Sequence, residues 1–303
     1  MTTVLQLAST GLLQGLIYSL IGLGLYLVFT VMRIVNFAHG YFVLIGMYGV
    51  LELKPQGLGG FITAVVVVAL AGAAVGYLVQ RFLLESGLNK GGYSQLVITL
   101  SLGIALQYVF QILYPVPFAT IANPYPFSAL TTSGITISAP RVAAGAISLL
   151  LALAVSFLVY STRAGSIIRA CSENLTGAIA VGINVRRVYR LTFALGCGLA
   201  AIAGALLISI QPVSPGLGLE LTIKAFIVVV VGGAGSLWGT VVAGSLLGLA
   251  EALGSLYAPG TLATALVYGL FFLVILIRPQ GLIVKRDASF RPQVSPAKAG
   301  DKG

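Results

Sequence analysis

The chain has 303 residues, of which 58% are hydrophobic and 8% are charged, whereas a typical soluble domain carries about a quarter charged residues. A water-soluble globule of this composition would lack a polar surface, so we predict an all-α, polytopic bundle of transmembrane helices. The formal net charge of +10 comes with no soluble domain that could hold nucleic acid, so it indicates membrane orientation and no nucleic-acid partner.

Six apolar runs are long enough to cross a bilayer as helices, which takes about 20 residues each. In chain order they are 11–32, 61–80, 94–114, 141–160, 191–210 and 261–277. No Lys or Arg precedes the first run, unlike the basic start of a cleavable signal peptide, so we expect a retained span. Two less regular stretches, 34–51 and 221–257, are broken by glycines and polar residues. We therefore expect about eight spans, and whether the two broken segments cross or re-enter stays open.

The broken stretches hold the polar and glycine residues that we consider for a translocation path. Polar side chains at membrane depth are costly unless they are paired or line a water-filled cavity, and glycines permit unwound backbone or close helix contact. Helix-end hydrogen bonding, close packing and a buried hydrogen bond are the structural alternatives. The candidates are Asn36, His39, Gly40, Gly232, Gly233, Gly235, Gly239 and Glu251. A weak internal repeat aligns 36–52 with 235–251, which pairs Gly40 with Gly239 and Glu52 with Glu251. Glu220 and Lys224 are four residues apart and are expected to pair along one helix face.

The connectors between the runs predict the orientation, because loops rich in Lys and Arg stay in the cytoplasm. With 161–190 inside, only Lys54, Arg141 and Lys224 of the 17 basic residues lie elsewhere, which leaves 14 on the cytoplasmic side. The N-terminus is then outside and the C-terminus inside. The external loop 115–140 contains five prolines, which disfavour helix, and we expect an irregular connector or a docking site. We divide the chain into a permease domain, 1–284, and a disordered cytoplasmic tail, 285–303.

The segment 161–190 is the longest charged stretch between spans. Ser172 is positioned to cap a short helix that has Glu173 in its first turn, where the helix dipole favours an acid. Small residues such as Ala178 and Gly182 follow, and a helix of this kind suits insertion into a groove on another protein. The alternative is an ordinary positive-inside loop.

Several kinds of chemistry are not indicated. Cys171 and Cys197 form no CxxC motif and His39 is the only histidine, so neither a metal site nor a disulfide framework is expected. No GxxxxGK[ST] motif occurs, so the chain has no phosphate-binding loop and energy for transport must come from a partner or an ion gradient. No acid, base and nucleophile converge, so we expect no catalytic residue and no enzyme.

Three long motifs carry a resemblance to a known family. They are RIVNFAHG at 33–40, RAGSIIRACSENLTGAIAVGINVRRVYRLTFALGCGLAAIAGALL at 163–207, and KAFIVVVVGGAGSLWGTVVAGSLLGLAEAL at 224–253. Together they resemble the permease subunits of bacterial branched-chain amino acid ABC transporters, over about residues 10 to 282. Where an acidic residue often follows NFAHG in that family, this chain has Tyr41.

The resemblance implies an importer in the bacterial inner membrane that moves branched-chain amino acids. Its expected partners are two cytoplasmic ATPase subunits that carry ATP and Mg²⁺, a second permease subunit, usually a paralogue, and an extracytoplasmic solute-binding protein. This chain would bind no cofactor of its own. Around 161–190 the resemblance implies a coupling helix that seats on an ATPase, with Arg169, Glu173, Asn174, Ala178 and Gly182. Urea and amide permeases share much of the pattern, and a secondary carrier driven by an ion gradient is the alternative from another class.

Overall fold

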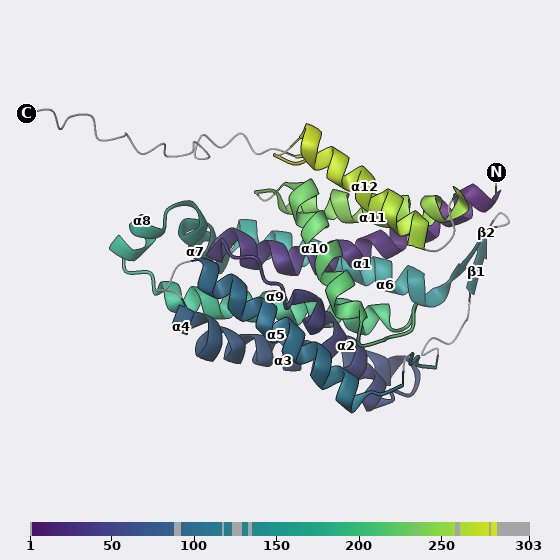
Figure 1. Ribbon diagram of the computed structural model, residues 1–303, viewed down its shortest axis with the longest axis horizontal. Coiled ribbons are helices and arrows are strands. Elements are labelled where there is room, and N and C mark those ends of the chain that lie inside the picture. The colour runs from purple at the N-terminus through teal and green to yellow at the C-terminus, as the bar shows by residue number, and fades with distance from the viewer. Residues whose placement is uncertain are drawn as a thin grey trace, which may run out of the picture.

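The computed structural model is a bundle of helices with one two-stranded hairpin at its end (Figure 1). It describes residues 2–87, 92–116, 118–122, 129–132, 135–233, 235–257, 261–278 and 280–283. The predicted all-α class is confirmed. The predicted tail, 285–303, lies outside the described residues.

Six helices in the described part of the chain are long and apolar enough to cross a membrane. They are α1 (Thr2–Met32), α3 (Gly57–Val79), α5 (Gly92–Leu113), α6 (Ala139–Ser161), α9 (Val185–Leu207) and α11 (Leu237–Tyr257). The shorter helices of the bundle are α2 (His39–Leu53), α10 (Leu217–Gly232) and α12 (Thr261–Ile277). All six predicted apolar runs are helical: five correspond to long helices, and 261–277 corresponds to the shorter α12. The sixth long helix, α11, lies in the broken stretch 221–257. Helix α9 starts before its run, because the arginines of its first turns extend it beyond the apolar part.

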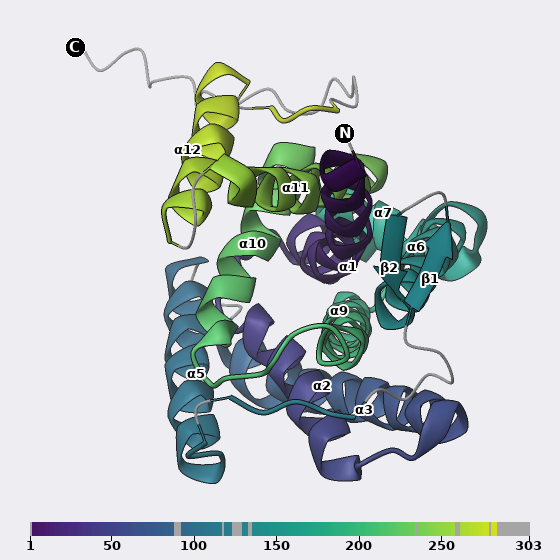
Figure 2. The same ribbon diagram turned by 90° about the vertical axis from the view of Figure 1, so that its right-hand side faces the viewer.

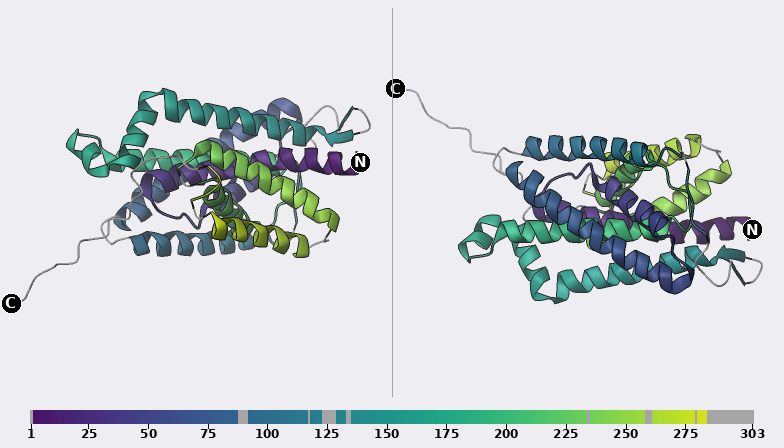
Figure 3. Two further views of the ribbon diagram at one scale, coloured as in Figure 1. Left: turned by 90° about the horizontal axis from the view of Figure 1, so that it is seen from above. Right: turned by 90° about the horizontal axis from the view of Figure 1, so that it is seen from below.

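The remaining elements lie at the two ends of the bundle (Figures 1 and 3). One end carries the short elements η1 (Gln80–Leu84), α4 (Glu85–Gly87), α7 (Arg163–Glu173) and α8 (Leu175–Ala180). The opposite end carries the N-terminus and the hairpin of β1 (Ala129–Thr132) and β2 (Ile135–Ser138), in which Ala129 pairs with Ser138. The expectation of an irregular connector over 115–140 is therefore wrong for 129–132 and 135–138, where Thr and aliphatic residues form the antiparallel pair.

Small residues let the helices approach closely, which suits a membrane where no hydrophobic force acts between helices. A Cβ on Gly15 of α1 would lie 2.6 Å from the Gly244 carbonyl oxygen of α11, and Ser19 donates a 2.8 Å hydrogen bond to the Val241 carbonyl. A Cβ on Gly46 of α2 would overlap the Ala201 carbonyl of α9. Backbone contact thus holds the centre of the bundle together.

Gly46→Ala is expected to lower the thermal stability of the detergent-solubilised protein, because the added methyl group forces α2 and α9 apart. Overpacking of this kind costs about 1–3 kcal/mol. Gly59→Ala is the matched control, since a Cβ there meets nothing within 4 Å. A melting curve followed by size-exclusion chromatography compares the two variants. Equal stability of both would show that the contact at Gly46 relaxes without cost.

Both broken stretches turn back inside the bundle. After Met32 the chain returns through 33–38, so that α2 begins where His39 Nε2 lies 3.0 Å from the Ile21 carbonyl oxygen of α1. Ile21 is about 16 Å along α1 from Met32 at 1.5 Å per residue. Helix α10 crosses the bundle steeply to α11, and the two helices meet where Gly232 packs against Gly239 (Figures 1 and 3). The stretch 34–51 is therefore a return loop and a half-length helix, and 221–257 holds two helices that meet at glycines.

Candidate functional site

A cluster of charged side chains lies where α1, α10 and α11 meet. Lys224 Nζ lies 2.8 Å from Glu220 Oε1, 3.0 Å from Glu251 Oε1 and 3.2 Å from the Tyr18 hydroxyl. Gln14 donates a 2.7 Å hydrogen bond to the same hydroxyl. The predicted pairing of Glu220 with Lys224 is confirmed. The contact with Tyr18 and the pairing of Lys224 with Glu251 were not predicted, because no local spacing indicates them.

The cluster is enclosed to different degrees on its different sides. The side chain of Lys224 is 9% exposed and that of Glu251 is 19% exposed, whereas that of Glu220 is 44% exposed. Lys224 Nζ also lies 4.8 Å from the centre of the buried Tyr18 ring, a cation–π contact. One ammonium group thus faces two carboxylates, and Glu220 is the most exposed residue of the three.

Asn36 and His39 are fully buried at the start of α2. Asn36 Oδ1 accepts a 3.1 Å hydrogen bond from the Ala38 amide, and His39 bonds the Ile21 carbonyl through Nε2. Among the described residues, Asn36 Nδ2 and His39 Nδ1 have no hydrogen-bond partner. Both residues lie inside the bundle, where α2 begins beside α1. Their local bonds suit a helix-end role, and a role in the translocation path stays a prediction.

The candidate glycines fall into three groups. A Cβ on Gly40 would overlap the Gly218 carbonyl of α10, and one on Gly232 would lie 2.5 Å from Thr240, so Gly40, Gly232 and Gly239 serve close packing around α10. Gly233 has a φ of 95°, in the left-handed region that favours glycine. Gly235 is exposed, and a Cβ there would meet nothing within 4 Å.

Helix capping in the predicted coupling segment, 161–190, differs from the expectation. Ser172 donates a hydrogen bond to the Arg169 carbonyl oxygen at 2.8 Å, and Glu173 is the last residue of α7. Asn174 caps α8 instead, with its Oδ1 accepting from the Gly177 amide at 2.8 Å. The predicted Ser172 cap is therefore wrong, because α7 continues through that residue and the chain turns at Asn174.

Three exposed side chains in and directly after α8 are apolar and larger than the small residues expected there. Ala178 is 3% exposed and packs inward, while Gly182 ends the turn with a φ of 83°. Leu175, Ile179 and Val181 are 42%, 59% and 77% exposed. We call these three residues the α8 tip. Small size at Ala178 thus serves packing within this chain, and the α8 tip is the surface offered to a partner.

Arg169 and Glu85 tie this end of the chain together. The Arg169 guanidinium bonds the Val159 carbonyl oxygen and lies over the Tyr160 ring, so it packs α7 against α6. The Arg190 guanidinium of α9 donates two hydrogen bonds, of 2.8 and 2.9 Å, to the Glu85 carboxylate. This role of Glu85 was not predicted, although Glu85 is the only acidic residue in the basic loop 81–93. This ion pair links the end of α3 to the start of α9. Helix α9 directly follows the segment that carries α8.

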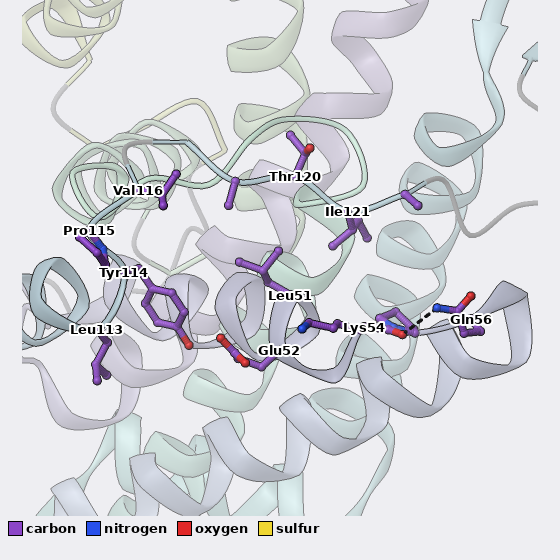
Figure 4. Close-up of a pocket in the computed structure, with 13 residues that line it drawn as sticks. Leu51, Glu52, Lys54, Gln56, Leu113, Tyr114, Pro115, Val116, Thr120 and Ile121 are labelled. Carbon is purple, nitrogen blue, oxygen red and sulfur yellow. Dashed lines mark hydrogen bonds between the residues drawn. The ribbon is translucent and has the colours of Figure 1, made fainter.

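A cavity of about 550 Å³ lies at the opposite end of the bundle, between the end of α2 and the chain after α5 (Figure 4). Glu52, Lys54 and Tyr114 lie among apolar walls formed by residues such as Leu51 and Ile121. Burial and the hydrogen bond with Glu52 raise the pKa of the Tyr114 hydroxyl. The cavity is separate from the Lys224 cluster, since none of its lining residues belongs to that cluster.

Comparisons with known proteins agree on one family. The profile described as branched-chain amino acid transport system / permease component matches residues 7–277. The chain is 30% identical over 296 residues to the high-affinity branched-chain amino acid transport system permease protein BraD of Pseudomonas aeruginosa, covering 92% of this chain and 95% of BraD. It is equally 30% identical over 298 residues to the LivH permease protein of Escherichia coli, with the same coverage. A shorter match, 36% over 110 residues, is to the autoinducer 2 import system permease protein LsrC of Salmonella paratyphi B, and covers 35% of this chain and 31% of LsrC.

Proposed function

Because this chain belongs to the family of permease components of branched-chain amino acid transport systems, we propose that it forms the translocation path for branched-chain amino acids in an ABC importer. As a member of this family it is a non-catalytic, multi-pass membrane subunit. The observation that supports an ATP-driven mechanism is the α8 tip, an exposed apolar surface at one end of the bundle (Figure 1). Exposed apolar side chains gathered at one end of a chain suit contact with a protein partner.

The proposal assigns a partner to each part of the molecule. Two ATPase subunits, which carry ATP and Mg²⁺, would seat on the α8 tips of this chain and of a second permease subunit. A solute-binding protein would dock at the end that carries the N-terminus and the hairpin. This chain would then bind no cofactor. Around the α8 tip, Arg169, Glu173, Asn174, Ala178 and Gly182 would shape the coupling segment, with Asn174 capping it and Ala178 packing it.

The solute is tested by reconstituting the complete complex in proteoliposomes. We expect leucine, isoleucine and valine to be taken up only with internal ATP and loaded binding protein. Uptake of urea or short amides in place of amino acids would favour the alternative solute class. Uptake that persists without ATPase subunits and collapses with an ionophore would indicate a secondary carrier and contradict the proposal.

Orientation gives a separate prediction, in which α7 and α8 face the cytoplasm and the N-terminus faces outward. Single cysteines at exposed Gln56 and Ser166 lie at opposite ends of the bundle, and can be introduced in a background without Cys171 and Cys197. An impermeant thiol reagent should label Gln56→Cys in intact cells and Ser166→Cys only after lysis. The reverse pattern would invert the orientation.

A further inference from the structure

We propose that the ion pair of Glu220 and Lys224 is a binding site at mid-membrane for the solute, a zwitterionic α-amino acid, on its way through the permease. This inference rests on the proposed function and adds the place and chemistry of recognition. The solute's ammonium group would bind the Glu220 carboxylate, and its own carboxylate would face Lys224.

The depth of the cluster is the first argument. Helix α1 has 31 residues from Thr2 to Met32, and Tyr18, which contacts Lys224, lies near its middle. A helix of that length is about 46 Å long, more than the roughly 30 Å of a hydrocarbon core. The cluster therefore lies near the centre of the bilayer, where ionisable side chains are rare, costly and usually functional.

The exposure of Glu220 is the second argument. It points away from the bundle, and its neighbours on α10, Leu219, Ile223 and Phe226, are 49%, 41% and 40% exposed. An ionised carboxylate at this depth does not face lipid tails, because its desolvation is too costly. In our proposal this face of α10 lines a water-filled path, with an apolar wall beside a carboxylate. Figure 2 shows α10 within the bundle, between α11 and α5.

The charge balance of the cluster is the third argument. Glu220 and Glu251 both contact the ammonium group of Lys224. Lys224 therefore remains paired with Glu251 when the Glu220 carboxylate binds a different cation. A zwitterion can insert between Glu220 and Lys224 and leave every charge paired. Its aliphatic side chain can pack on the stripe of Leu219, Ile223 and Phe226. Urea or a neutral amide has no ammonium group to exchange for that of Lys224.

Thiol accessibility in the assembled transporter tests the aqueous path. Ile223→Cys, in the background without native cysteines, should react with a positively charged methanethiosulfonate faster than with a negatively charged one, and saturating leucine should slow the reaction. Leu150→Cys is the matched control, because Leu150 is 64% exposed at the middle of α6 and is expected to face lipid. If Ile223→Cys is as unreactive as Leu150→Cys, lipid or the second permease subunit covers this face and the inference is wrong.

Transport by Glu220→Gln tests the recognition step. This variant keeps the neutral pair of Lys224 and Glu251, so it should fold and assemble with the ATPase subunits. Its maximal rate of leucine uptake should fall about tenfold or more, since hydrogen bonds to charged groups are the strong ones. Wild-type leucine uptake by Glu220→Gln would overturn the inference alone, whereas a wild-type complex that imports no amino acid would contradict the proposed function.

Discussion

Lys224→Met should largely abolish folded permease in the membrane. Methionine fills similar space but leaves Glu220 and Glu251 as two carboxylates beside Tyr18, with no cation to balance them. Removing one partner of a buried ion pair costs about 3–5 kcal/mol, which is a large part of the stability of a typical domain. Fluorescence-detected size-exclusion chromatography of tagged protein should show a loss of the monodisperse peak relative to wild type.

A double variant separates the lost charge from lost packing. Lys224→Met combined with Glu251→Gln removes a positive and a negative charge together, so the enclosed part of the cluster becomes neutral while Glu220 keeps access to the path. Much of the monodisperse peak should return. If Lys224→Met is as stable as wild type, water already screens the cluster. If instead the double variant is no better than the single one, the hydrogen bond from Lys224 to Tyr18 matters more than charge balance.

Val181→Glu is expected to weaken binding of the ATPase subunits to the permease without affecting the fold of the membrane bundle. Val181 is 77% exposed, so a carboxylate there is harmless in the isolated chain, but it would be buried without a partner in a docked complex. Central interface residues contribute about 2 kcal/mol or more, which corresponds to roughly a 30-fold loss of affinity. Co-purification with the ATPase subunits and stimulated ATP hydrolysis should both fall, and Ile179→Glu should act in the same direction.

Comparison with Ala178→Trp distinguishes a defect in ATPase docking from a defect in folding. Ala178 is buried within this chain, so tryptophan there should disrupt the packing of α8 and reduce the folded protein itself. Val181→Glu should leave the melting temperature unchanged. Full ATPase capture by Val181→Glu would show that the α8 tip is not the docking surface, and the coupling assignment would then have to move to another part of this end.

Local patterns were sufficient for much of this protein. Apolar runs of about 20 residues located five of the six long helices, because a bilayer imposes the same length on every span. The sixth, α11, lies in the stretch 221–257, where glycines and polar residues interrupt the apolar run. The pairing of Glu220 with Lys224 could be predicted, because residues four apart on a helix always lie on neighbouring turns. Three long motifs were enough to indicate the family. Helix ends were less predictable, as α9 shows, because arginines at the end of a span continue the helix without adding to its apolar run.

Contacts between segments far apart in the sequence could be identified only from the tertiary structure. Tyr18 and Lys224 are 206 residues apart, and nothing in the spacing of either residue indicates the other. The choice of Asn174 over Ser172 as a cap depended on where α7 stops, which is decided by its packing on α6 and α9. Ala178 is small because neighbouring helices cover it, and not because a partner does. Periodicity encodes the neighbours of a residue on its own helix, whereas burial, charge pairing across helices and the surface left for partners arise only when the helices pack together.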